Sequence, residues 1–210
     1  MIKAIIFDFD GVIADTEMAI FNTNKKIMDI FGKKSSMTFE EYRRQITNWK
    51  EMYKKIGFTE EELAKVPDIF LAEIMKMDKD IHIFDGVENL LRTLRKKFKM
   101  AIVSNGDKRR IKHQLDANNL TGCFDIIIDL TAEKHKPDPH QMIVCMNALD
   151  VSPQETCVIG DSTDDILAAK RAGVAKIIAV TYGYQPKEML MGADVLVDTP
   201  QELLAILEAL

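Results

Sequence analysis

The sequence has no long apolar run, few cysteines and no excess of positive charge. No stretch approaches the roughly 20 apolar residues that a membrane-spanning helix needs, so we expect no membrane partner. A strand-like apolar pattern begins directly after Met1, which argues against a signal peptide. With 28 Lys and Arg against 33 Asp and Glu, the formal net charge of −5 argues against a nucleic-acid partner.

The three cysteines lie far apart in the sequence, and no two of them form a CxxC pair. They are Cys123, Cys145 and Cys157. This usage is typical of reduced thiols in a cytoplasmic protein, not of a disulfide framework or a zinc site. The 210 residues are 47% hydrophobic and 29% charged, which is ordinary for a globular protein, and the length suits one domain with a smaller insert.

The first chemical feature is an apolar run, residues 2–7, that ends abruptly in Asp8-Phe9-Asp10-Gly11. Short apolar runs rich in β-branched residues are typical of buried parallel strands. Because side chains alternate along an extended chain, Asp8 and Asp10 are expected on the same side just past the strand end, where open α/β sheets bind ligands. A simple turn is an equally good interpretation of this stretch by itself, since Asp and Gly often end strands.

From about residue 16 to residue 82 the apolar spacing is helical, without strand-like alternation. The expected features are a helix from Met18 to Phe31, capping boxes at Thr38 with Glu41 and at Thr59 with Glu62, and a helix restart at Pro67. The middle helix carries an apolar stripe, typical of a core, made of Phe39, Tyr42, Ile46, Trp49, Met52, Tyr53 and Ile56. We therefore expect a helical cap domain of residues 16–82 inserted into a core domain of residues 1–15 and 83–210.

Beyond residue 85, strands and helices alternate, which predicts an α/β fold with a parallel, doubly wound sheet. Strands are expected near residues 100–103, 124–129, 156–159, 176–180 and 193–197. Helices are expected near residues 87–98, 109–118, 139–149, 163–172 and 200–210.

Four of the expected strand ends carry polar groups, which this kind of fold brings together. They are Asp8 and Asp10, Ser104 and Asn105, Lys136, and the acids Asp161, Asp164 and Asp165. Carboxylates in one crevice repel one another, and Mg²⁺ relieves that repulsion because it prefers carboxylate and phosphate oxygens. The histidines and cysteines form no cluster that suits a softer metal. A lysine and a hydroxyl at the same place suit an anionic phosphate substrate.

Four motifs, in order, resemble those of the haloacid dehalogenase (HAD) superfamily over essentially the whole chain. They are Asp8–Val12, Ser104–Gly106, Lys136–Pro139 and Gly160–Asp165. The helical insert between the first two motifs resembles that of the family's phosphoglycolate phosphatase and β-phosphoglucomutase-like branch. The resemblance implies a parallel sheet with the strand order 5-4-1-2-3, in which the first and fourth strands are neighbours.

The resemblance also implies catalytic roles for four residues. Asp8 is expected to be the nucleophile that forms an aspartyl-phosphate. Asp10 is expected to protonate the leaving oxygen and then to deprotonate the hydrolytic water. Ser104 is expected to hydrogen-bond the transferring phosphoryl group, and Lys136 to neutralise charge on that group and on Asp8.

Binding roles are implied in the same way. The expected phosphate contacts come from Gly11, Ser104, Asn105 and Lys136. The expected Mg²⁺ site consists of Asp8, the backbone carbonyl of Asp10, Asp161 and Asp165. Asp164 is a less favoured alternative to Asp165. For both acids, a structural place in the first turn of a helix is an equally good interpretation, since Ser162 with Asp165 also fits a helix capping box.

Members of the family differ in chemistry, and the sequence favours a phosphatase. The dehalogenase branch lacks the second aspartate of the first motif, which is present here as Asp10. A phosphonoacetaldehyde hydrolase needs a Schiff-base lysine in the insert, where most lysines adjoin other charges. The mutase branch has a histidine where residues 18–20 are Met, Ala and Ile, and residues 43–50 lack its glycine-rich loop. Thr181–Tyr184 resembles the phosphoglycolate phosphatases.

We therefore expect a Mg²⁺-dependent phosphatase that acts on a small phosphorylated metabolite, with phosphoglycolate as the leading substrate. A sugar phosphate mutase of the β-phosphoglucomutase type and a non-catalytic HAD-like binding protein are the alternatives. The insert is expected to act as a lid with hinges near residues 14–16 and 82–86. We expect a cytoplasmic monomer or weak homodimer without nucleic-acid or membrane partners.

Overall fold

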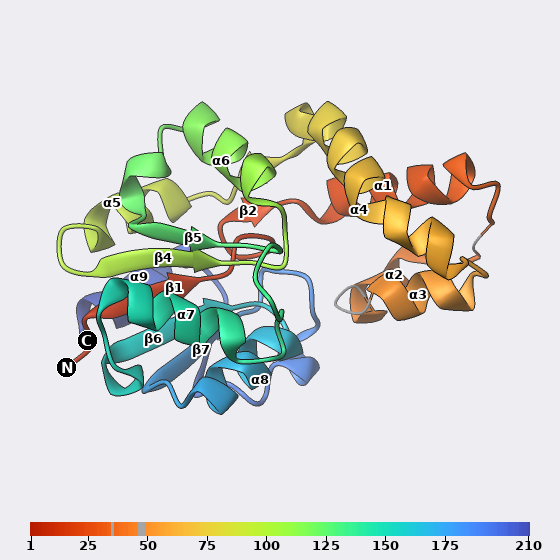
Figure 1. Cartoon of the computed structure of the whole chain (residues 1–210). Helices are drawn as coiled ribbons and strands as arrows, with labels where there is room; N and C mark the ends of the chain where they lie inside the picture. The colour runs from red at the N-terminus through yellow and green to blue at the C-terminus, as the bar shows by residue number, and fades with distance from the viewer. Residues whose placement is uncertain (35, 46–48) are drawn as a thin grey trace. The chain divides into compact units, whose positions relative to one another are not determined.

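The computed structural model of the protein describes residues 1–34, 36–45 and 49–210 (Figure 1). The chain forms two compact units, one made of Met1–Asp15 with Ile83–Leu210 and the other of Thr16–His82. Where the chain passes from one unit to the other, the two-residue strands β2 (Ala14–Asp15) and β3 (His82–Ile83) pair with each other.

A six-stranded parallel sheet forms the centre of the larger unit, in the order β5-β4-β1-β6-β7-β8. Its strands are β1 (Ala4–Phe7), β4 (Lys99–Val103), β5 (Ile126–Ile128), β6 (Thr156–Gly160), β7 (Lys176–Val180) and β8 (Val195–Val197). The predicted order 5-4-1-2-3 is confirmed for the first five strands of this sheet in chain order. Strand β8 adds a sixth strand beside β7.

Helices cover both faces of this sheet (Figure 1). They are α5 (Val87–Leu94), α6 (Lys108–Ala117), α7 (His140–Leu149), α8 (Thr163–Ala172) and α9 (Pro200–Glu208). Ala4 and Ile6 of β1 share one core cluster with residues of α7 and α8. Because side chains alternate along a strand, the buried Ile5 and Phe7 point to the opposite face.

Short 3-10 turns connect several of these elements. They are η3 (Thr121–Cys123), η4 (Pro153–Glu155) and η5 (Lys187–Met189). The prediction of a helix over residues 87–98 is too long, because α5 ends at Leu94. The Lys97 N–H donates to the Leu94 carbonyl three residues back, so the last turn tightens before Phe98 enters the core.

The strand register determines which residues leave the sheet together. Phe7 of β1 is aligned with Ile102 of β4 on one side and with Ile159 of β6 on the other. The strands are parallel, so Asp8 and Ser104, which directly follow β1 and β4, emerge at the same edge. This carboxyl edge is where open α/β sheets bind ligands.

The smaller unit is helical in its described residues. Its elements are α1 (Glu17–Ile30), α2 (Phe39–Gln45), α3 (Trp49–Lys55), α4 (Glu60–Ile74) and η2 (Met75–Asp80). Both predicted capping boxes are present: Thr38 and Thr59 each exchange hydrogen bonds with the glutamate three residues later. Ile46, part of the expected apolar stripe, lies outside the described residues.

The core of the smaller unit contains a buried polar network. The Tyr53 hydroxyl donates to Asn24 Oδ1 at 2.6 Å, and Asn24 Nδ2 donates to the Tyr42 hydroxyl at 2.8 Å. Trp49 packs against the same cluster, as expected for a core stripe. These hydrogen bonds satisfy polar groups that would otherwise destabilise an apolar interior.

The prediction that a helix restarts at Pro67 is wrong, because α4 runs unbroken through this residue. A proline in a helix interior removes one hydrogen bond and costs about 3 kcal/mol. Leu63, Val66 and Ile74 of α4 are all buried, and the burial of this apolar face offsets that cost. Within the described part of the chain, no helix is both long and apolar enough to cross a membrane.

Candidate active site

Asp8 directly follows β1, and its side chain is 11% exposed. Its Oδ1 accepts the Phe9 N–H at 2.6 Å, and its Oδ2 lies 3.0 Å from the Nζ of Lys136. Burial, followed by the negative charge of Asp165, raises the pKa of Asp8 to about 8, although Lys136 opposes the rise. A second positive charge beside Asp8, in addition to Lys136, would therefore stabilise the ionised form of Asp8.

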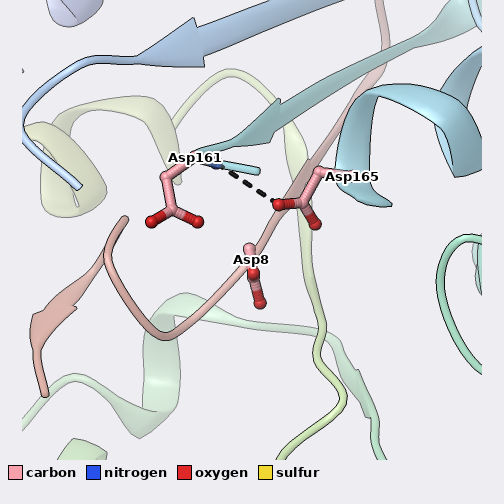
Figure 2. A group of neighbouring side chains, drawn as sticks. All are labelled: Asp8, Asp161 and Asp165. Carbon is pink, nitrogen blue, oxygen red and sulfur yellow. Dashed lines mark hydrogen bonds between the residues drawn. The ribbon is translucent and has the colours of Figure 1, made fainter. Parts of the chain in front are cut away.

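Three carboxylates from three elements converge at this edge of the sheet (Figure 2). Asp8 follows β1, Asp161 follows β6, and Asp165 belongs to the first turn of α8; one oxygen of each lies within 4.8 Å of the others. Asp161 also accepts the Tyr184 N–H at 2.6 Å. Burial, with the charges of Asp165 and Asp8, raises the pKa of Asp161 well above its ordinary value.

The Lys136 side chain reaches this cluster from the loop between β5 and α7. Its Nζ lies 2.6 Å from Asp165 Oδ1 and 3.0 Å from both Asp8 Oδ2 and the Val103 carbonyl. Burial lowers the pKa of Lys136, but the charges of Asp165 and Asp8 outweigh burial, so this pKa lies above its ordinary value. Lys136 therefore stays a cation at neutral pH.

Asp165 belongs to the carboxylate cluster and also caps α8. Its Oδ2 accepts the hydroxyl and the N–H of Ser162, at 2.6 and 3.1 Å, and lies 3.3 Å from the Asp161 N–H. Its Oδ1 accepts Lys136, so both oxygens already have protein partners. Among the described residues, the cluster includes Asp165 and not Asp164.

Asp10 is not one of these three carboxylates, and it pairs with Arg110 of α6, a residue that the sequence interpretation missed. Arg110 Nη2 donates to Asp10 Oδ2 at 2.6 Å, and the Arg110 side chain is 3% exposed. The guanidinium also lies over the Phe9 ring, 5.5 Å from its centre. Three consecutive basic residues open α6, so the sequence contained no signal that selected this arginine.

Ser104 is buried directly after β4, and its Oγ accepts the Gly106 N–H at 2.9 Å. This contact uses a lone pair of Oγ and not its hydrogen, so the hydroxyl can still donate to another acceptor. A Cβ placed on Gly106 would lie 3.2 Å from both Ser104 Oγ and Asp10 Oδ2, and 2.7 Å from Arg110 Nη2. Ser104, Asp10 and Arg110 therefore surround one glycine.

Asn105 and Gln141 hold the loop that carries Lys136. Asn105 Nδ2 donates to the Lys136 carbonyl at 3.1 Å, and its Oδ1 accepts the Lys136 N–H at 3.2 Å. Gln141, fully buried and not identified from the sequence, accepts the same N–H at 3.0 Å and donates to the Ser104 and Asp129 carbonyls. The described contacts of Asn105 thus position Lys136.

Gly11 and Gly183 let the backbone approach Asp161 closely. Gly11 has φ +75°, and a Cβ there would lie 2.1 Å from Asp161 Oδ2. A Cβ on Gly183 would lie 2.4 Å from the Asp161 Cβ. The Gly11 N–H donates to the Ala14 carbonyl at 2.9 Å, within the turn after Asp10. Any side chain at either glycine would displace Asp161.

The donor set of the cluster fits a hard dication. It consists of carboxylate oxygens, without imidazole or thiolate, and Lys136 balances only part of its negative charge. The raised pKa values of Asp8 and Asp161 have the same cause, an uncompensated negative charge in a buried place. A cation beside carboxylates, a hydroxyl donor and a separate acid is an arrangement that can catalyse phosphoryl transfer.

This fold and this site define a hydrolase of the haloacid dehalogenase-like class, and the chain belongs to that family: residues 5–180 match its model, described as haloacid dehalogenase-like hydrolase. The chain is 30% identical to the pyrophosphatase PpaX of Halalkalibacterium halodurans, over 92% of this chain and 90% of that one. It is 28% identical to phosphoglycolate phosphatase 1 of Pseudomonas aeruginosa, over 87% and 70%.

A solved structure has the same fold. It is described as a predicted phosphatase from Clostridium acetobutylicum, and it superposes with a TM-score of 0.88 at 23% identity over 100% of both chains. The expected family and α/β fold are therefore confirmed, and the chain is an enzyme of the hydrolase class.

Proposed function

We propose that the protein is a Mg²⁺-dependent phosphatase that hydrolyses a small phosphorylated metabolite, with phosphoglycolate as the leading substrate. The observation that carries the proposal is the position of Lys136, whose Nζ lies 3.0 Å from Asp8 Oδ2 beside the three-carboxylate cluster. An anionic nucleophile that attacks an anionic phosphate needs this kind of fixed positive charge. The names of the two relatives support phosphate esters or anhydrides as substrates.

The first chemical step is the attack of an Asp8 carboxylate oxygen on phosphorus. This step forms an aspartyl-phosphate and breaks the bond between phosphorus and the leaving oxygen, which takes a proton from Asp10. The Ser104 hydroxyl, whose lone pair accepts the Gly106 N–H, donates its hydrogen to a phosphoryl oxygen. Lys136 neutralises charge on Asp8 and on the transferring group.

The second step is hydrolysis of the aspartyl-phosphate. Asp10 takes a proton from water, the water oxygen attacks phosphorus, and Asp8 is released together with inorganic phosphate. Arg110 holds the Asp10 carboxylate at 2.6 Å and so limits its rotation between the two steps. Asp10 therefore acts as the acid in the first step and as the base in the second. Asp8 forms its bond to phosphorus in the first step and loses it in the second.

The residues that would hold Mg²⁺ are Asp8, Asp161 and the backbone carbonyl of Asp10. Bound Mg²⁺ supplies positive charge that keeps Asp8 ionised and stabilises the charge of the phosphoryl oxygens. Asp165 already accepts four donors, including Lys136, so we assign it to holding Lys136 and the α8 turn beside the ion. The helical unit Thr16–His82 acts as a lid that excludes water, with hinges near residues 14–16 and 82–86.

The test is phosphate release from phosphoglycolate, pyrophosphate and p-nitrophenyl phosphate, with Mg²⁺ and with EDTA. We expect Mg²⁺-dependent release that is fastest with phosphoglycolate. Lack of release from all three substrates would contradict the phosphatase assignment. Formation of glucose 6-phosphate from β-glucose 1-phosphate with a bisphosphate primer, faster than phosphate release, would favour the mutase alternative instead.

A further inference from the structure

Arg110 has a buried donor that the proposed mechanism does not use. Its Nη2 donates to Asp10 Oδ2 at 2.6 Å, but its Nη1 is buried and has no hydrogen-bond partner among the described residues. An arginine stays protonated in proteins, so these N–H groups cannot be removed by deprotonation. Buried donors without partners are rare because they are costly, and each one calls for an explanation such as a functional role or a water or ion that completes it.

The neighbours of Arg110 place its guanidinium beside Asp10 and Ser104. The guanidinium adjoins Asp10, and a Cβ on Gly106 would lie 2.7 Å from Arg110 Nη2 and 3.2 Å from Ser104 Oγ. Arg110 belongs to the first turn of α6, whose first N–H groups, those of Lys108 and Arg109, already donate to Asp129 and Asp107. The unpartnered Nη1 of Arg110 is therefore the group next to Asp10 that can bind an anion.

We propose that Arg110 Nη1 binds an anionic oxygen on the leaving group of the substrate, and so selects phosphate compounds whose leaving group is itself negatively charged. This inference rests on the proposed phosphatase function. Asp10 is the residue that protonates the leaving oxygen, so the arginine bonded to Asp10 lies on the leaving-group side. The transferring phosphoryl group already has Lys136, Ser104 and the dication site as its partners. A carboxylate or a second phosphate near the scissile bond fits this position.

The decisive comparison uses two substrates that differ only in charge: 2-phosphoglycolate and 2-phosphoglycolamide, in which a neutral amide replaces the carboxylate. In the wild-type enzyme we expect kcat/KM to be higher for the acid by a factor on the order of tenfold to a hundredfold, typical of a charged hydrogen bond. A ratio near one in the wild type would overturn the proposal without any variant.

Variants of Arg110 distinguish a role in substrate recognition from a purely structural role. Arg110→Met should bring the acid-to-amide ratio close to one, chiefly through KM for the acid, and Arg110→Lys should retain part of the ratio. Lys112→Met removes an exposed charge from the same helix and should leave the ratio unchanged. A purely structural role for Arg110 predicts instead that both substrates slow equally and the ratio stays, which would refute the assignment.

A binding measurement tests the role of Arg110 separately from the proposed phosphatase activity. In an Asp8→Asn background, calorimetric titration with the acid and the amide measures recognition without turnover. Tighter binding of the acid that is lost in Asp8→Asn/Arg110→Met supports the role of Arg110. Equal binding of acid and amide overturns it, even where wild-type phosphate release supports the phosphatase. If the wild type releases phosphate from no substrate, the proposed phosphatase function is wrong. The binding comparison of acid and amide still tests whether Arg110 recognises the anionic group.

Discussion

The Nζ of Lys136 lies 2.6 Å from Asp165 Oδ1, in a pair whose side chains are 3% and 1% exposed. The same Nζ reaches Asp8 at 3.0 Å, so one buried cation links the proposed nucleophile to the cap of α8. Because Asp165 also holds the N–H groups of Asp161 and Ser162, the lysine is fixed relative to the strand end that carries Asp161. The positive charge of Lys136 and the positions of the three carboxylates therefore depend on one another.

Replacing Lys136 with methionine should remove the charge balance of the whole cluster. The buried carboxylates of Asp8 and Asp165 would lose their cation, so we expect the free energy of unfolding to fall by about 3–5 kcal/mol in metal-free buffer. Urea unfolding followed by circular dichroism measures this change. The double variant Lys136→Met/Asp165→Asn should recover part of the loss, and a single-variant loss below about 1 kcal/mol would contradict the role of this lysine.

Asp8→Asn should abolish turnover and leave the fold intact. The amide keeps the shape of the side chain but cannot form an aspartyl-phosphate, so we expect phosphate release to fall to the background rate. Stability at pH 8 should not decrease, because burial already disfavours the charge on Asp8. Asp68→Asn, the same change at an exposed acid of α4, is the control. Residual turnover above background would contradict the nucleophile assignment.

Mg²⁺ should stabilise the protein more strongly at high pH than at low pH. The folded-state pKa of Asp8 is raised to about 8, from an ordinary value of 3.8. Between these values the folded chain keeps a proton that the unfolded chain loses, so metal-free stability falls as pH rises toward 8. A dication favours the ionised carboxylate and cancels this loss.

Thermal unfolding in Mg²⁺ and in EDTA, at pH 6 and pH 8.5, checks this expectation. The difference in Tm between Mg²⁺ and EDTA should grow with pH in the wild type. It should nearly disappear in Asp161→Asn, which removes a carboxylate of the proposed site. A Mg²⁺ effect that is absent, or equal at both pH values, would argue against a dication on these residues.

Gly11→Ala should reduce activity and stability together. The new Cβ would lie 2.1 Å from Asp161 Oδ2 at a residue with φ +75°, so both the side chain and the backbone would be strained. We expect about 1–3 kcal/mol of destabilisation and a clear loss of phosphate release. Gly122→Ala is the matched control, since nothing lies within 4 Å of its Cβ position. Equal behaviour of the two variants would show that Gly11 does not constrain Asp161.

Local sequence patterns predicted the elements of this protein well, because their causes are local. The apolar run before Asp8, the capping boxes at Thr38 and Thr59, and the alternation of strands and helices beyond residue 85 each follow from spacing or from contacts a few residues apart. Two predictions were wrong: α4 continues through Pro67 because packing of its apolar face outweighs the local preference of proline, and α5 ends at Leu94, earlier than predicted.

The sequence by itself determined which strand ends carry acids, a hydroxyl and a lysine, since these residues stand at the ends of recognisable apolar runs. Only the tertiary structure decided how they are paired. Arg110 meets Asp10 across 100 positions of sequence, and Gln141 joins Ser104 to the loop of Lys136. Such long-range contacts depend on the order and register of parallel strands, which no local pattern encodes, and they assign Asp10 a partner that the motif alone could not identify.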